Sequence, residues 1–129
     1  PRSLRLLANC FGWLQVSRPD ARTLRIRPER GFFDNELLRM VRGLSRPFHA
    51  GDEVALSDMR VRVREVTVDG RPAEADFSFG VPLEDASLVW MRLHAGGSLA
   101  PWRPPAVGQS QRLAAVEPRA AATTSAVSR

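Results

Sequence analysis

The residues that decide the fold run from Met59 to Phe79, MRVRVREVTVDGRPAEADFSF. Apolar and charged residues alternate there at a period of two, which is typical of strands with one buried face. Asp69-Gly70 divides the stretch and is the two-residue signature of a type I′ hairpin turn. The parity of the valines changes near Arg64, so a β-bulge is needed to keep all of them, through Val68, in the core. The stretch predicts an antiparallel hairpin with a bulge in its first strand.

A second hairpin is predicted over residues 14–27. Leu14 to Ser17 and Thr23 to Arg27 are short alternating runs, and Arg18-Pro19-Asp20-Ala21 lies between them. Proline presets the backbone angle of a turn, and aspartate can accept a hydrogen bond from its own backbone two residues further on.

Other short apolar runs predict further strands. Together with the Met59 to Phe79 hairpin, those after residue 52 suggest a β meander over residues 53–113, with its last strand at an edge. The additional runs are Leu4 to Leu7, Glu53 to Leu56, Ser87 to Leu93 and Val107 to Leu113.

One segment has the period of a helix instead. Over residues 34–44 the apolar residues recur at helical spacing, Asp34 or Asn35 can serve as the N-cap, and Gly43 with Arg46-Pro47 ends the pattern. A helix of about ten residues is marginal alone in water, so we expect it to dock on a sheet.

The predicted fold class is α+β and mainly β. We expect residues 1–113 to form a single domain, a small antiparallel barrel or curled sheet with one short docked helix. Residues 114–129 are mostly Ala, Ser, Thr and Val without a period. Such a segment buries too little to offset its ordering entropy, which predicts a disordered tail.

Composition limits the class of protein. The chain has 129 residues and a formal net charge of +5, the size of about one globular domain. No apolar run approaches the roughly 18 residues that cross a bilayer. The single cysteine, Cys10, excludes an internal disulfide framework and a zinc finger. Because the chain begins at Pro1, without an initiator methionine, we expect a fragment or a processed product.

Alternating arginines form the main candidate surface. Arg60, Arg62 and Arg64 would project from one strand face, and Arg25 and Arg27 from another. Such a surface could bind nucleic acid, lipid headgroups or an acidic protein. The favoured alternative is a solvated face on which these arginines pair with acidic residues of the hairpin partner strand, Glu74 and Asp76. Trp102, set among prolines, is the second candidate, as an exposed contact for another domain.

Chemical sites have little support in the sequence. His49, Asp52 and Glu53 could hold a divalent ion if the Gly51 turn brought them together. The favoured interpretation is a turn whose carboxylates cap backbone N–H groups. Neither a Gly-x-Ser-x-Gly elbow nor a phosphate-binding glycine loop occurs. We therefore assign no catalytic residue and expect no cofactor.

Three stretches of the sequence resemble the C-terminal extramembrane portion of multi-pass bacterial membrane proteins to which no activity is assigned. They are RPFHAGDEVALSDMRVRVREVTVDGRPAEADFSF at residues 46–79, VPLEDASLVWMRL at 81–93 and PPAVGQSQRL at 104–113. The resemblance implies membrane association and a location at the soluble face of a bacterial membrane. The turn at Gly51 to Glu53 and the strands after it are also similar to the small C-terminal accessory domain of CorC-like transporter-associated proteins.

The function predicted from all of this is a non-catalytic accessory or interaction domain of a larger membrane-associated bacterial protein. Its partner would be the remainder of the parent chain or another protein, and nucleic acid is not the expected partner. Two alternatives stay open. One is a fragment of an enzyme whose site is completed upstream of Pro1, and the other is a basic nucleic-acid-binding domain.

Overall fold

The structure, a computed structural model, describes residues 3–9, 12–32, 48–56, 58–93, 98–114 and 123–128. All regular secondary structure in these ranges is β. The strands are β1 (Ser3–Asn9), β2 (Leu14–Asp20), β3 (Thr23–Pro28), β4 (Glu53–Ala55), β5 (Met59–Val66), β6 (Pro72–Phe79), β7 (Leu88–Leu93), β8 (Leu99–Pro101), β9 (Ser110–Leu113) and β10 (Thr123–Ser128).

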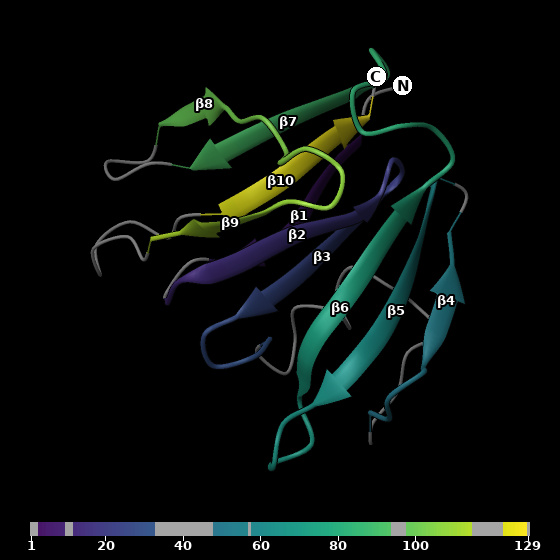
Figure 1. Cartoon of the computed structure of the whole chain (residues 1–129), viewed down its shortest axis with the longest axis vertical. Coiled ribbons are helices and arrows are strands. Elements are labelled where there is room, and N and C mark those ends of the chain that lie inside the picture. Colours follow the sequence, from purple (N-terminus) through teal and green to yellow (C-terminus); the bar gives the residue numbers. More distant parts are fainter. Residues whose placement is uncertain are drawn as a thin grey trace.

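The described strands form two open antiparallel sheets. One has six strands in the order β4-β5-β6-β3-β2-β9, and the other has four in the order β1-β10-β7-β8 (Figure 1). The mainly β class is confirmed, but the predicted small barrel is wrong. After β6 the chain passes through residues 80–87 into the second sheet, so the strands are divided between two sheets and neither closes on itself.

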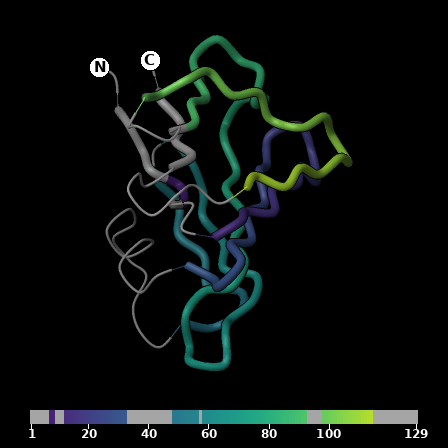
Figure 2. Tube along the Cα trace, turned by 90° about the vertical axis from the view of Figure 1, so that its left-hand side faces the viewer, coloured from purple at the N-terminus to yellow at the C-terminus, as the bar shows by residue number. Residues whose placement is uncertain are grey.

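The hairpin of β5 and β6 is confirmed, with its bulge. The register runs from Met59 opposite Phe79 to Val63 opposite Ala75 and then shifts on both sides of Glu65. The turn projects at the lower end of the molecule in both views (Figures 1 and 2).

The type of this turn differs from the prediction. A type I′ turn needs a positive φ at both central residues, whereas Gly70 has a φ of 83° and Asp69 is not in the left-handed region. Gly70 N instead donates to Thr67 O (3.0 Å), and Thr67 N donates to Arg71 O (2.7 Å). The loop therefore has three residues and ends in a glycine bulge. As a result Val68 lies at the tip, fully exposed, and not in the core as expected.

The hairpin of β2 and β3 is also confirmed, from Leu14 opposite Pro28 to Asp20 opposite Thr23. Its turn differs from the prediction, because β2 continues through Asp20 and the chain reverses at Ala21 and Arg22, not over residues 18–21. Strands are present in all four of the other predicted regions, as β1, β4, β7 and β9. The predicted meander is correct for β4 to β6 only. β7 and β8 join the second sheet, and β9 returns to the edge of the first, beside β2.

Two other predictions concern the remaining segments. The predicted helix at residues 34–44 lies outside the described residues. The predicted disordered tail differs from the structure at Thr123–Ser128, which form β10 between β1 and β7. Hydrogen bonding to two neighbouring strands supports this segment, although its sequence has no hydrophobic period. Within the described ranges, no helix has the length and apolarity needed to cross a bilayer.

Residues from both sheets form one core. Leu7 of β1 and Trp90 of β7 belong to the same buried cluster as Val16, Ile26 and Phe77 of the six-stranded sheet. The Trp90 ring makes edge contacts with Phe79, at 5.4 Å between centroids, and the Trp90 indole Nε1 donates to Leu83 O (2.8 Å). Burying these apolar side chains is the main stabilising contribution to such a fold.

The period of two gives the six-stranded sheet a second face. On β3, β5 and β6 every second residue is buried and the residues between point away from the core. We call the part of this second surface that β3 to β6 form the outer face. Its residues are Thr23, Arg25 and Arg27 of β3, Glu74, Asp76 and Ser78 of β6, Arg60, Arg62, Arg64 and Glu65 of β5, and Glu53 of β4.

Candidate functional site

Strand register places opposite charges side by side on the outer face. Arg25 is opposite Asp76, Asp76 is opposite Arg62, and Arg62 is opposite Glu53. One row across β3, β6, β5 and β4 thus alternates between positive and negative side chains. Directly opposed residues of antiparallel strands lie about 5 Å apart, close enough for such pairs to interact.

Arg25 and Asp76 form a two-bond ion pair. Arg25 Nε donates to Asp76 Oδ1 (2.8 Å) and Nη2 donates to Oδ2 (3.2 Å). These hydrogen bonds raise the pKa of the Arg25 guanidinium, against a smaller opposing effect of desolvation. The fork geometry makes this a strong form of arginine–carboxylate contact.

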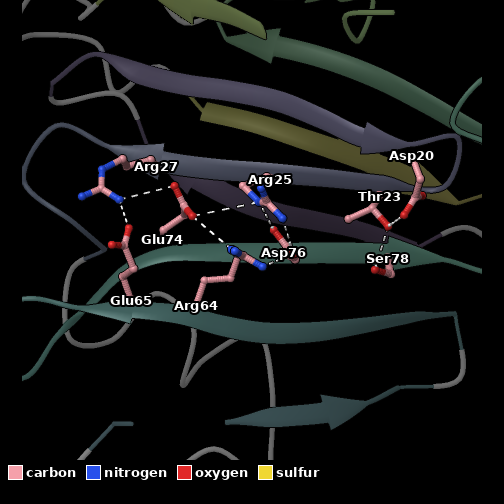
Figure 3. A network of polar contacts seen from close by, with 9 residues as sticks. All are labelled: Asp20, Thr23, Arg25, Arg27, Arg64, Glu65, Glu74, Asp76 and Ser78. Carbon is pink, nitrogen blue, oxygen red and sulfur yellow. Dashed lines mark hydrogen bonds and ion pairs between the residues drawn. The ribbon is translucent and has the colours of Figure 1, made fainter. Parts of the chain in front are cut away.

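Glu74 connects the next arginines (Figure 3). Its carboxylate oxygens accept from Arg64 Nε (3.2 Å) and from Arg27 Nη1 (3.3 Å). Arg64 also reaches Asp76, at 3.6 Å from Nη1 to Oδ2. Arg27 donates a second hydrogen bond to Glu65, which raises the pKa of the Arg27 guanidinium. We call Arg25, Arg27, Arg64 and their three carboxylate partners the ion-pair network.

The ion-pair network accounts for the contacts of Arg25, Arg27 and Arg64. Arg25, Arg27 and Arg64 are held by carboxylates of the same sheet, as expected for a solvated face with internal pairing. The pairing predicted with Glu74 and Asp76 is therefore confirmed for these three arginines, but not for Arg60 and Arg62. A polyanion would have to compete with these carboxylates at each of the three positions.

Arg60 and Arg62 are in a different situation. Arg60 Nη1 lies 3.1 Å from Glu53 Oε1, but both side chains are exposed, at 61% and 37%. Arg62 forms no ion pair with any residue in the described part of the chain. Surface pairs such as Arg60–Glu53 contribute little, about 0–1 kcal/mol. These two arginines are the cations of the outer face that remain open to a ligand.

A polar hollow of about 270 Å³ lies beside these two arginines. It exists because Thr23 and Ser78, opposite one another on β3 and β6, have short side chains between rows of long ones. The hollow is lined by Pro19, Asp20, Thr23, Arg25, Glu53, Arg60, Arg62, Asp76 and Ser78.

Three carboxylates line the hollow, those of Asp20, Glu53 and Asp76. The oxygens of Asp20 accept hydrogen bonds from neighbouring residues of its own turn. Thr23 Oγ1 donates to Asp20 Oδ2 (3.1 Å), and Asp20 Oδ1 accepts from Arg22 N (2.8 Å). Since the Thr23 proton is used, the 3.0 Å contact between the Thr23 and Ser78 hydroxyls must have Ser78 as donor. Asp20, Asp76 and Glu53 thus all have partners other than Arg62.

The candidate metal ligands do not assemble. Asp52 Oδ2 accepts from His49 N (2.8 Å), while the imidazole Nδ1 lies 4.0 Å from the same oxygen. Glu53 faces Arg60 instead. The capping interpretation of this turn is confirmed for Asp52. No group of three or more His, Cys, Asp or Glu residues that could hold a metal ion occurs among the residues described.

Trp102 was predicted to be exposed to solvent, but the structure shows it partly buried. Its ring is partly buried against the core, with its centroid 6.0 Å from that of Trp90. Its backbone N donates to Trp90 O (3.0 Å). The prolines around Trp102 end β8 but do not prevent the side chain from packing, and this residue supports the fold.

Sequence reasoning missed Arg18, the most buried arginine among the described residues. Its side chain is 3% exposed, and its guanidinium donates two hydrogen bonds to Glu84, one to Ala21 O (2.9 Å) and one to Pro105 O (3.2 Å). The hydrogen bonds with Glu84 raise the pKa of Arg18 and lower the pKa of the Glu84 carboxyl. The sequence did contain a signal for this burial. Arg18 follows Leu14 and Val16 at a spacing of two, so its side chain points to the same buried side of the strand.

Arg18 fixes three segments to one another. Besides its side-chain bonds to residues 21, 84 and 105, its backbone exchanges hydrogen bonds with Gln109 O (3.1 Å) and Gly108 N (2.7 Å). It thereby anchors the connection between β8 and β9, which extends to the right in Figure 2. All of its partners belong to the chain itself, so Arg18 is a structural residue.

Comparison with known proteins adds no assignment: no family model, curated protein or solved structure matches this chain.

Proposed function

We propose that this chain is a non-catalytic interaction domain that binds a protein partner at the polar hollow of the outer face. The observation that carries the proposal is the division of the arginines. Three are neutralised within the ion-pair network, whereas Arg62 has no carboxylate partner in the described chain and Arg60 has an exposed one. An external ligand in the hollow could supply the negative charge that Arg62 does not receive from the described residues.

The other candidate surfaces give weaker support. Trp102 packs against Trp90, and His49, Asp52 and Glu53 do not come together. A nucleic-acid interface needs cations facing successive phosphates, and the carboxylates of the ion-pair network occupy those positions. The outer face is thus better suited to a partner that touches it at one place.

Site-specific photocrosslinking in cells that make the parent protein tests this proposal. A photoreactive amino acid replaces Ala55, an exposed β4 residue opposite Arg60, in one variant and Val107, an exposed residue of the β8–β9 connection, in the control, so that Arg60 and Arg62 stay intact. We expect a defined crosslinked species from position 55 and none from position 107. The proposal fails if position 55 gives no crosslinked protein, or if both positions give the same species.

We also propose, from the sequence resemblance to extramembrane portions of bacterial proteins, that the domain belongs to a membrane-associated parent. Membrane fractionation of cells expressing the parent gene checks this. The parent should sediment with the membranes and stay there in high salt, whereas release by salt or recovery in the soluble fraction would contradict the proposal.

A further inference from the structure

We infer that the partner is an extended acidic segment whose carboxylates, two residues apart, pair with Arg60 and Arg62. This inference rests on the proposed function and names the class of partner. The observations behind it are the spacing of the two arginines, the state of their present contacts and the charges of the surrounding face.

The spacing of Arg60 and Arg62 suits an extended ligand. They are alternate residues of β5 on the same face, so their Cα atoms are separated by about 6–7 Å. An extended segment repeats its side chains on one side at the same interval. A Glu-x-Glu or Asp-x-Asp sequence can therefore bring one carboxylate to each guanidinium, in the fork geometry that arginine favours.

The present contacts leave both arginines available. Binding at Arg62 breaks no ion pair with a described residue, and its neighbours Asp76 and Glu53 already contact Arg25 and Arg60. Arg60 would exchange one exposed carboxylate, Glu53, for another. The other three arginines of the outer face would lose a network contact if they turned to a ligand.

The surrounding charges favour a short acidic segment over nucleic acid. Glu53, Glu65, Glu74 and Asp76 lie on the same face as the five arginines. A continuous phosphate backbone crossing this face would meet these carboxylates, whereas a segment with two carboxylates can contact the Arg60–Arg62 end alone. In addition, β3, β5 and β6 present no aromatic side chain on this face on which bases could stack beside the arginines.

A fluorescent peptide, Gly-Ser-Glu-Ser-Glu-Ser-Gly, provides the probe, with its Gln-for-Glu version as the neutral control. Anisotropy is followed with the whole chain up to about 1 mM, because two ion pairs alone give weak binding. We expect the acidic peptide to bind, with an affinity that falls several-fold between about 50 and 200 mM salt, and the neutral peptide not to bind.

Variants locate the contact. Arg62→Gln should weaken peptide binding by at least about fivefold, roughly the effect of one charge-assisted hydrogen-bonded pair. Arg103→Gln, an exposed arginine outside the sheet, is the matched control and should bind as the unchanged chain does. Circular dichroism of both variants confirms that they fold, which we expect because neither side chain is buried.

Three outcomes would overturn the inference. They are no binding of the acidic peptide, equal binding by Arg62→Gln, or preference for a single-stranded oligonucleotide of equal charge over the peptide. A crosslinked protein at position 55 without peptide binding would preserve the interaction domain and remove the acidic segment. Failure of the inference and failure of the proposed function are thus distinguishable.

Discussion

At the residue scale, Arg18 shows how one side chain can fix several loops. Its guanidinium donates to Glu84, Ala21 and Pro105, which come from three separate connections. A buried arginine is tolerated when its hydrogen bonds and its charge are compensated. The sequence could place Arg18 on the buried side of β2, but not identify Glu84, because local periodicity contains no information about a contact across 66 positions.

Replacing Arg18 should therefore destabilise the fold. Arg18→Met keeps much of the apolar stem but removes the donors to Ala21 O and Pro105 O, and we expect a loss of about 1–3 kcal/mol in the free energy of unfolding. Urea denaturation measures it. Arg22→Met, an exposed arginine in the adjacent turn, is the control and should change stability by less than about 0.5 kcal/mol. Equal effects of the two substitutions would show that Arg18 is not an anchor.

Glu84 gives this anchor a defined pH dependence. The hydrogen bonds from Arg18 lower the pKa of the folded Glu84 carboxyl, so the pair stabilises the fold fully above the ordinary carboxyl pKa. The contribution is lost as the pH falls through the ordinary value and then through the lowered folded value.

The comparison with Glu84→Gln tests this dependence. The unchanged chain should exceed the variant in stability by the largest amount at neutral pH. The difference should shrink as the pH falls below the ordinary carboxyl pKa and disappear below the lowered pKa of the folded Glu84 carboxyl. The carboxyls of Asp69 and Asp85, whose pKa values are lowered by other hydrogen bonds, are common to both proteins and cancel. A difference that stays constant with pH would contradict the ion pair.

At the element scale, the hairpins follow from local sequence and the sheet assignment does not. Alternation and turn residues were enough to predict the β2–β3 and β5–β6 hairpins and the bulge near Glu65. The separation of β1, β7, β8 and β10 from the other strands depends on long-range pairing. The pairing of β10 with β1 joins the two ends of the sequence, and its small residues give no periodic signal.

The turn between β5 and β6 leads to an element-scale prediction. Gly70 has a φ of 83° and nothing within 4 Å of the position that a Cβ would occupy, so an alanine there is penalised by backbone conformation alone. We expect Gly70→Ala to lower the free energy of unfolding by about 1–2 kcal/mol. Gly70→Asn should be milder, because asparagine enters the left-handed region more readily.

Gly80 is the control for this prediction. It has the same open surroundings without a positive φ, so Gly80→Ala should leave stability unchanged or raise it by about 0.4–1 kcal/mol. Thermal or urea unfolding of the three variants measures these effects. Equal destabilisation by alanine at positions 70 and 80 would contradict the glycine-bulge turn.

At the scale of the whole molecule, the charge balance of the outer face determines which polyanions it attracts. The chain has a net charge of +5, yet the outer face, which holds five of its arginines, also holds the carboxylates that neutralise three of them. The sequence allowed both the basic surface and the internally paired face. The register of β3, β5 and β6 decides in favour of pairing at Arg25, Arg27 and Arg64.

Removing the central carboxylates should turn the outer face into a polyanion-binding surface. In the double variant Glu74→Gln, Asp76→Asn the main carboxylate partners of Arg25 and Arg64 are lost, so the protein should elute from heparin at clearly higher salt. The variant Glu29→Gln, Asp85→Asn changes the net charge equally but lies off the outer face, and it should shift elution much less. Equal shifts would mean that net charge, and not the network, controls binding.

The central claim is that Arg62 is available on the outer face while Arg25 and Arg64 are held within it. The most direct measurement is an arginine Nε–Hε NMR spectrum of the whole chain, recorded with and without the alternating acidic peptide. The Nε–H groups of Arg25 and Arg64, which donate to Asp76 and Glu74, should exchange slowly with water and keep their shifts when peptide is added. The Nε–H of Arg62 should exchange quickly and move on titration. Shifts at Arg25 and Arg64 with none at Arg62, or equal exchange at all three, would contradict the claim.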